Sequence, residues 1–135
     1  MTEENPSILN HASIAVTDGP RSLAFYDAVM ATIGASRVHE EPDAVAYGKA
    51  FPEFWVHPVP FDGGSPGTAN GVHFSFSAAS ENQVTAFHEA ALAHGGQDDG
   101  APGPRPQYGE PYYGCFVRDP DGHKIEATFW DESKM

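Results

Sequence analysis

Two histidines occupy matching places in an internal repeat of the sequence. When the chain is shifted along itself by 62 positions, segment 11–34 lies over segment 73–96 without a gap, and His11 coincides with His73. A repeat of this length predicts two similar supersecondary units. Pairing the units about a pseudo-twofold axis would bring both imidazoles to a shared cleft. Imidazole is a common ligand of divalent metals, so the repeat suggests a metal site.

A carboxylate near the end of the chain can complete such a site. In the strand-like segment around His73, alternation places this histidine and Ser75 on the face opposite Phe74. In the last strand-like segment, Glu126 lies on the face opposite the apolar residues and can reach the same cleft. Two imidazoles and a carboxylate bind a divalent cation and leave positions open, where a substrate oxygen can be polarised. The predicted metal ligands are His11, His73 and Glu126.

Strands and helices must hold these residues in place, and the hydrophobic periodicity predicts two modules of the same order. The first module, about 8–60, is expected to contain a strand, a helix capped by Asp18 and three short strands. The second, about 71–130, repeats a strand and a helix capped by Ser80 and closes with strands at 112–118 and 124–130. Segment 97–111 reads as a long loop, dense in Gly and Pro, without a conventional strand. The expected fold is α+β: one domain, 1–135, whose two βαβββ modules form a cupped mixed sheet around a cleft, with the helices outside.

Three stretches of the chain resemble the vicinal-oxygen-chelate superfamily of glyoxalase I, fosfomycin thiol transferases, bleomycin-resistance proteins and extradiol dioxygenases. They are NHASIAV at 10–16, the strand of His73, and DPDGHKIE at 119–126. The resemblance places His11, His73 and Glu126 on three of four ligand positions, and Trp55 on the fourth. Tryptophan cannot ligate a metal. The chain therefore lacks the glutamate that takes part in proton transfer at this position in four-ligand glyoxalases.

The resemblance implies a glyoxalase-like metalloenzyme that acts on an oxygen-bearing small molecule. Zinc, manganese, iron(II), nickel or cobalt suits the predicted ligands. The reaction stays open among lyase or isomerase chemistry, thiol transfer and dioxygenation. The alternative is a metal-free protein that sequesters a small molecule, as bleomycin-resistance proteins do; net acidity would suit a cationic drug. Relatives commonly dimerise, sometimes by exchanging modules, which implies a homodimer.

Other residues are candidates for catalysis or substrate binding. His57 shares strand parity with Trp55 and could act as a general base, or be an exposed histidine at a strand end. Trp55 could stack on substrate or fill the core. Arg105 could pair with a carboxylate or phosphate, or be a solvated surface residue. Lys124 is assigned no chemistry. The predicted substrate-binding residues are Trp55, Ser13, Ser75, Arg105, Tyr108 and Tyr113.

The composition restricts the partners and the compartment. The 7 basic and 19 acidic side chains give a net charge of −12, which argues against nucleic acid and anionic membrane surfaces. A single cysteine fits a reducing compartment, and no apolar run resembles a signal peptide or a membrane span. We therefore expect a cytoplasmic protein with a small-molecule substrate and neither nucleic acid nor a membrane as partner.

Overall fold

The protein folds into two modules of the same order, as the internal repeat predicts. The computed structural model describes residues 4–60 and 62–135. The first module comprises β1 (Ala12–Ala15), α1 (Gly19–Thr32), β2 (Ser36–Glu41), β3 (Ala44–Gly48) and β4 (Phe54–His57). The second comprises β5 (His73–Ser77), α2 (Glu81–Ala93), β6 (Gln97–Pro104), β7 (Tyr112–Arg118) and β8 (Lys124–Trp130). Two short 3-10 helices, η1 (Pro106–Tyr108) and η2 (Glu132–Lys134), flank β7 and β8.

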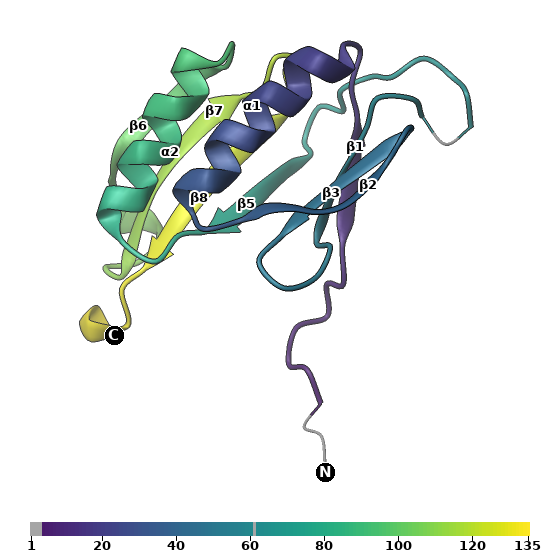
Figure 1. Ribbon diagram of the computed structural model, residues 1–135. Helices are drawn as coiled ribbons and strands as arrows, with labels where there is room; N and C mark the ends of the chain where they lie inside the picture. Colours follow the sequence, from purple (N-terminus) through teal and green to yellow (C-terminus); the bar gives the residue numbers. More distant parts are fainter. Residues whose placement is uncertain (1–3, 61) are drawn as a thin grey trace.

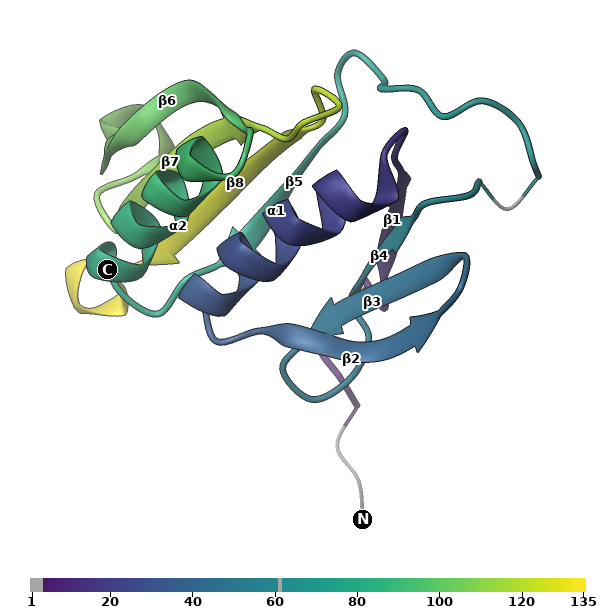
Figure 2. The ribbon, with the colours of Figure 1, turned by 45° about the horizontal axis from the view of Figure 1, so that its top comes forward.

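Both α-helices begin at the caps that the sequence predicts. Asp18 and Ser80 each accept a hydrogen bond from the backbone N–H three residues later, which satisfies a first-turn donor. Gly34 and Gly95 follow the helices with φ of 80° and 96°, a conformation that glycine adopts without steric cost. The helices lie side by side (Figures 1 and 2). Across residues 4–60 and 62–135, no helix has the length and apolar character needed to cross a membrane.

Each module forms its own four-stranded mixed sheet. The strand orders are β1-β4-β3-β2 and β5-β8-β7-β6. In both sheets the first strand of the module runs parallel to the last, and the remaining neighbours are antiparallel. This arrangement confirms the α+β, two-module fold and leaves β1 and β5 as edge strands (Figure 2).

The registers of the two sheets match. In the first sheet Ser13 lies beside Trp55, and in the second Ser75 lies beside Glu126. Since Ser13 and Ser75 are equivalent in the repeat, Trp55 occupies the place in the first sheet that Glu126 occupies in the second. The backbone thus supports the alignment that placed a non-ligating residue at this position.

Strand β6 corrects the expectation of a long loop over 97–111. Residues Gln97–Pro104 pair antiparallel with β7, with register shifts between Asp98 and Gly100 and between Gly100 and Gly103. Strand β6 is an edge strand, where glycine, proline and irregular pairing are tolerated. Because it is largely exposed, it lacks the apolar alternation that makes a strand visible in a sequence.

One hydrophobic core includes residues of both modules. Tyr26 of α1 and Phe87 of α2 are fully buried in it, as is Ile125 of β8. The Tyr26 hydroxyl donates to Asp119 at 2.7 Å. This buried bond ties the turn before β8 to the helix of the other module, and so positions the strand that carries Glu126.

Candidate functional site

A histidine–carboxylate pair lies on the second sheet. His73 begins β5, Glu126 lies within β8, and Nε2 of the imidazole is 3.2 Å from Oε1 of the carboxylate. The Glu126 side chain is 8% exposed, whereas that of His73 is 47% exposed. The strand register therefore holds a nearly buried carboxylate beside a solvent-accessible imidazole.

Hydroxyl groups orient the Glu126 carboxylate. Its Oε2 accepts hydrogen bonds from Tyr112 at 2.6 Å and from Thr128 at 2.7 Å. Ser75 Oγ lies 2.6 Å from Thr128 Oγ1 and extends this network to β5. Burial, together with the hydrogen bond to Glu126, raises the pKa of Tyr112 well above its ordinary value, so the phenol stays protonated and donates. The network occupies Oε2, while Oε1 faces His73.

The geometry of this pair fits two ligands of one divalent cation. Imidazole nitrogen and carboxylate oxygen bind zinc at about 2.0–2.2 Å, so ligands at roughly right angles lie about 3 Å apart. The 3.2 Å between His73 and Glu126 agrees with that spacing. Hydrogen bonds to a ligating carboxylate are the support that metal sites usually have. The same distance also suits a direct hydrogen bond between the two side chains.

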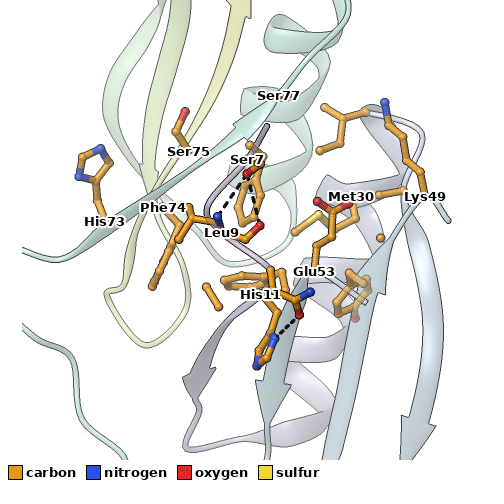
Figure 3. A pocket seen from close by; sticks show the side chains of 18 residues that line it. Ser7, Leu9, His11, Met30, Lys49, Glu53, His73, Phe74, Ser75 and Ser77 are labelled. Carbon is orange, nitrogen blue, oxygen red and sulfur yellow. Dashed lines mark hydrogen bonds between the residues drawn. The ribbon is translucent and has the colours of Figure 1, made fainter. Parts of the chain in front are cut away.

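His11 does not join the pair within its own chain. It lies just before β1, exposed, with Nδ1 2.7 Å from the side-chain oxygen of Asn10. His11 and His73 line one pocket of about 630 Å³, but their imidazoles point in different directions (Figure 3). Among the residues that the structure describes, no three His, Cys, Asp or Glu side chains form a group that could hold a metal. The chain therefore brings together two of its three predicted ligands.

A second pocket, of about 600 Å³, contains both members of the pair. Of the predicted substrate-binding residues, Arg105 and Tyr108 lie on its wall. Apart from His73 and Glu126, which are predicted metal ligands, the other lining residues are not among the predicted site residues. The full wall consists of His73, Asp99, Gly100, Arg105, Tyr108, Tyr112, Phe116, Lys124 and Glu126.

Strand parity explains which tyrosine reaches this pocket. Cys115 and Val117 are fully buried, and Tyr113, which has their parity along β7, packs against the core. Tyr112 and Phe116 have the opposite parity and line the pocket. The alternation in β7 contained this signal, but it becomes usable only once the buried face is known.

The remaining candidates lie on the first sheet. The Trp55 ring is 5.4 Å from that of His39 and 6.3 Å from that of His57, with which it stacks at 23°. Ser13 lines a separate small pocket of about 190 Å³. Neither pocket that contains His73 has Ser13, Trp55 or His57 on its wall. Ser75, by contrast, reaches Glu126 through Thr128.

Comparisons with known proteins agree with this fold. Residues 8–127 match the model of the glyoxalase/bleomycin resistance protein/dioxygenase superfamily. The crystal structure of a glyoxalase/bleomycin resistance protein from Albidiferax ferrireducens T118 is similar, with 33% sequence identity and a TM-score of 0.80. The similarity covers 90% of this chain and 98% of that one. No curated protein matches the sequence.

Two more distant structures share the fold alone. A glyoxalase-related enzyme from Fulvimarina pelagi is 20% identical, with a TM-score of 0.68 over 93% of this chain and 88% of that one. The fosfomycin resistance protein FosX from Listeria monocytogenes is 18% identical, with a TM-score of 0.62 over 90% of this chain and 92% of that one.

Proposed function

Because the chain belongs to the glyoxalase/bleomycin resistance protein/dioxygenase superfamily, we propose that it is a metalloenzyme that holds a divalent cation at His73 and Glu126. The main support is the nearly buried Glu126 carboxylate, with one oxygen bound by two hydroxyls and the other 3.2 Å from His73. A bound cation supplies polarisation of a substrate oxygen. The ligand types accommodate zinc, manganese, iron(II), nickel or cobalt.

The third ligand in this proposal is His11 of a second copy of the chain. His11 is exposed and lies apart from the pair in its own chain. It follows Ile8 and Leu9, which are 98% and 75% exposed, and such neighbouring apolar side chains favour burial against a partner. A twofold dimer would present each His11 to the His73–Glu126 pair of the other copy. The proposed active form is therefore a homodimer.

The protein's own groups have distinct proposed roles at this site. Tyr112 and Thr128 hold the Glu126 carboxylate, and the pocket beside it receives an oxygen-bearing small molecule. Since Trp55 stands where a second carboxylate would lie, proton transfer by a glutamate at that position is not part of the proposal. The reaction remains a lyase or isomerase step, thiol transfer or dioxygenation.

Trp55, His57 and Ser13 take part only through the dimer. They lie on the first sheet, away from the pocket wall of the same chain. If the second copy brings its first sheet over this pocket, Trp55 can stack on substrate and His57 can act as a general base. This role belongs to the same proposal as the ligand role of His11.

A metal-free, small-molecule-binding protein of the bleomycin-resistance type is the second candidate. It is favoured by one observation: within the described part of the chain, no three metal-binding side chains come together. In that case His73 and Glu126 would form a hydrogen-bonded pair in the wall of a sequestering pocket.

Metal titration distinguishes the two candidates. EDTA-treated protein is titrated with Mn²⁺ or Co²⁺, alongside His73→Ala and, as a matched control, His94→Ala at the end of α2. We expect one cation per chain in the wild type and the control, and an affinity at least about 100-fold lower in His73→Ala. The absence of metal uptake by the wild type would favour the binding protein.

Mixed dimers test the contribution of His11. A His11→Ala chain and a His73→Ala chain are unfolded together, refolded as a mixture and titrated with the same cation. If the site is shared, each mixed dimer has one intact site and one that lacks both histidines, so metal binding is partly restored. If each site lies within one chain, mixing restores nothing.

A further inference from the structure

Two cationic side chains flank one aromatic ring in the pocket of the His73–Glu126 pair. Lys124 Nζ lies 5.0 Å from the centroid of the Phe116 ring, and Arg105 Cζ lies 6.0 Å from it. Phe116 pairs with Glu126 across β7 and β8. The two cations are therefore at the same pocket as the proposed metal ligands, although they come from different strands and connections.

The backbone holds Arg105 in this position. Its Nη2 donates to the carbonyl oxygen of Ala101 at 2.7 Å, and its Nη1 to that of Pro104 at 3.3 Å. A Cβ added to Gly100 or Gly103 would lie 3.3 or 3.2 Å from the guanidinium, so the two glycines leave room for it. The remaining N–H groups of the guanidinium stay available to a ligand, since arginine carries five.

The local charge is opposite to that of the whole chain. Asp99 is shared between Arg118 at 3.0 Å and Lys124 at 3.7 Å. Arg105 makes no ion pair with any carboxylate in residues 4–60 and 62–135. With Glu126 counted, three cations meet two carboxylates in and beside this pocket, within a protein of net charge −12. A divalent cation on the pair would increase the positive potential.

We propose that Arg105 and Lys124 form an anion subsite, which binds a carboxylate, phosphate or phosphonate group of the substrate while its apolar part contacts Phe116. This assignment rests on the proposed function for the location of the reacting end, and it adds the class of substrate. Paired cations beside an aromatic surface suit an oxyanion attached to an apolar body. The subsite also argues against a cationic ligand, which the net charge alone would favour.

Phenylphosphonate is the probe for this subsite. Its binding to the EDTA-treated full chain is measured by calorimetry for the wild type, Arg105→Gln and Lys124→Gln, with Lys134→Gln as a control lysine outside the pocket. We expect each pocket substitution to weaken binding about tenfold and the control to leave it unchanged. Lys124→Arg, which keeps the charge, should retain most of the affinity, and melting curves verify that the variants are folded.

Three results would overturn the subsite. They are undiminished binding to folded Arg105→Gln and Lys124→Gln, equal affinity for benzylamine, and binding that appears only with Mn²⁺ and ignores both substitutions. Phenylphosphonate binding that depends on Arg105 and Lys124 in a protein that takes up no metal would support the subsite and contradict the proposed metalloenzyme. Metal uptake, together with phenylphosphonate binding that does not depend on Arg105 or Lys124, would support the metalloenzyme and contradict the subsite.

Discussion

The two sheets share one backbone register but carry different side chains on corresponding positions. Beside Ser75 the second sheet holds Glu126, and beside Ser13 the first holds Trp55. A buried carboxylate requires donors, and the second sheet supplies them from Tyr112 and Thr128. The first sheet instead stacks Trp55 with His57 and places the tilted ring of His39 beside it. The comparison shows that equivalent strand positions carry a hydrogen-bonded polar site in the second module and an aromatic surface in the first.

One carboxylate in each module shows a similar contrast between a buried and an exposed environment. Asp119, before β8, is buried, and burial raises its pKa even though bonds from Tyr26 and the backbone oppose the shift. Asp27 on α1 is half-exposed; burial raises its pKa, but hydrogen bonds from Arg37 and Tyr47 outweigh this and lower it. Neutral donors hold the buried carboxylate of the second module, whereas an ion pair on the surface dominates in the first.

The largest effect is expected at Asp119. Its carboxylate accepts from the Tyr26 hydroxyl and from the backbone N–H groups of Asp121 and His123. Replacement by alanine leaves these donors without their acceptor, so Asp119→Ala should lower the free energy of unfolding by about 3 kcal/mol. Chemical denaturation measures the loss. Asp119→Asn, which keeps one acceptor oxygen, should cost less; equal stability of the alanine variant and the wild type would show that this bond does not hold the modules together.

A smaller effect is expected from a pair of tyrosine variants. Tyr112→Phe removes a donor to the Glu126 carboxylate and should weaken metal binding about tenfold, as loss of outer hydrogen bonds to a ligand typically does. Tyr113→Phe is the matched control, because its side chain packs on the opposite face of β7. Titration of both variants with Mn²⁺ checks the difference. The same loss in both variants would mean that the two faces of β7 do not differ in function.

The smallest effect concerns the pH dependence of stability. The pKa of Asp27 is lowered in the fold, so its contribution is present above its unfolded pKa of about 3.9 and is lost as the pH falls through the folded value. The group is half-exposed and screened by solvent, so its effect is small. In Asp27→Asn, the free energy of unfolding should fall on acidification by less than in the wild type, the difference being under about 1 kcal/mol.

Asp119 should titrate in the opposite sense. Because its pKa is raised in the fold, its protonation favours the fold most below the unfolded pKa, and this gain declines as the pH rises through the folded value. Urea unfolding at a series of pH values between about 2.5 and 6 compares Asp27→Asn with Asp119→Asn. Parallel pH profiles of the two variants would contradict the assigned difference between the carboxylates.

Sequence patterns predicted the parts of the site that depend on local order. Strand alternation placed His73 and Glu126 on the faces opposite the apolar residues of their strands, and the structure brings their side chains within 3.2 Å. The resemblance to the superfamily placed Trp55 at the position equivalent to Glu126, and the strand registers make the two residues equivalent. The strand faces need only the period of a strand, and the pairing of His11 with His73 needs only the symmetry of two copies; both are written in the order of residues.

Only the tertiary structure decided which distant groups meet. It separates His11 from the pair, makes an edge strand of a segment without apolar alternation, and brings Lys124 and Arg105 to the ring of Phe116. Periodicity tells which face of a strand a residue occupies, but not which other element packs near that face. By itself the sequence determined two equivalent modules and their polar faces; the packing of helices and sheets set the distances between them, because those depend on contacts between residues far apart in the chain.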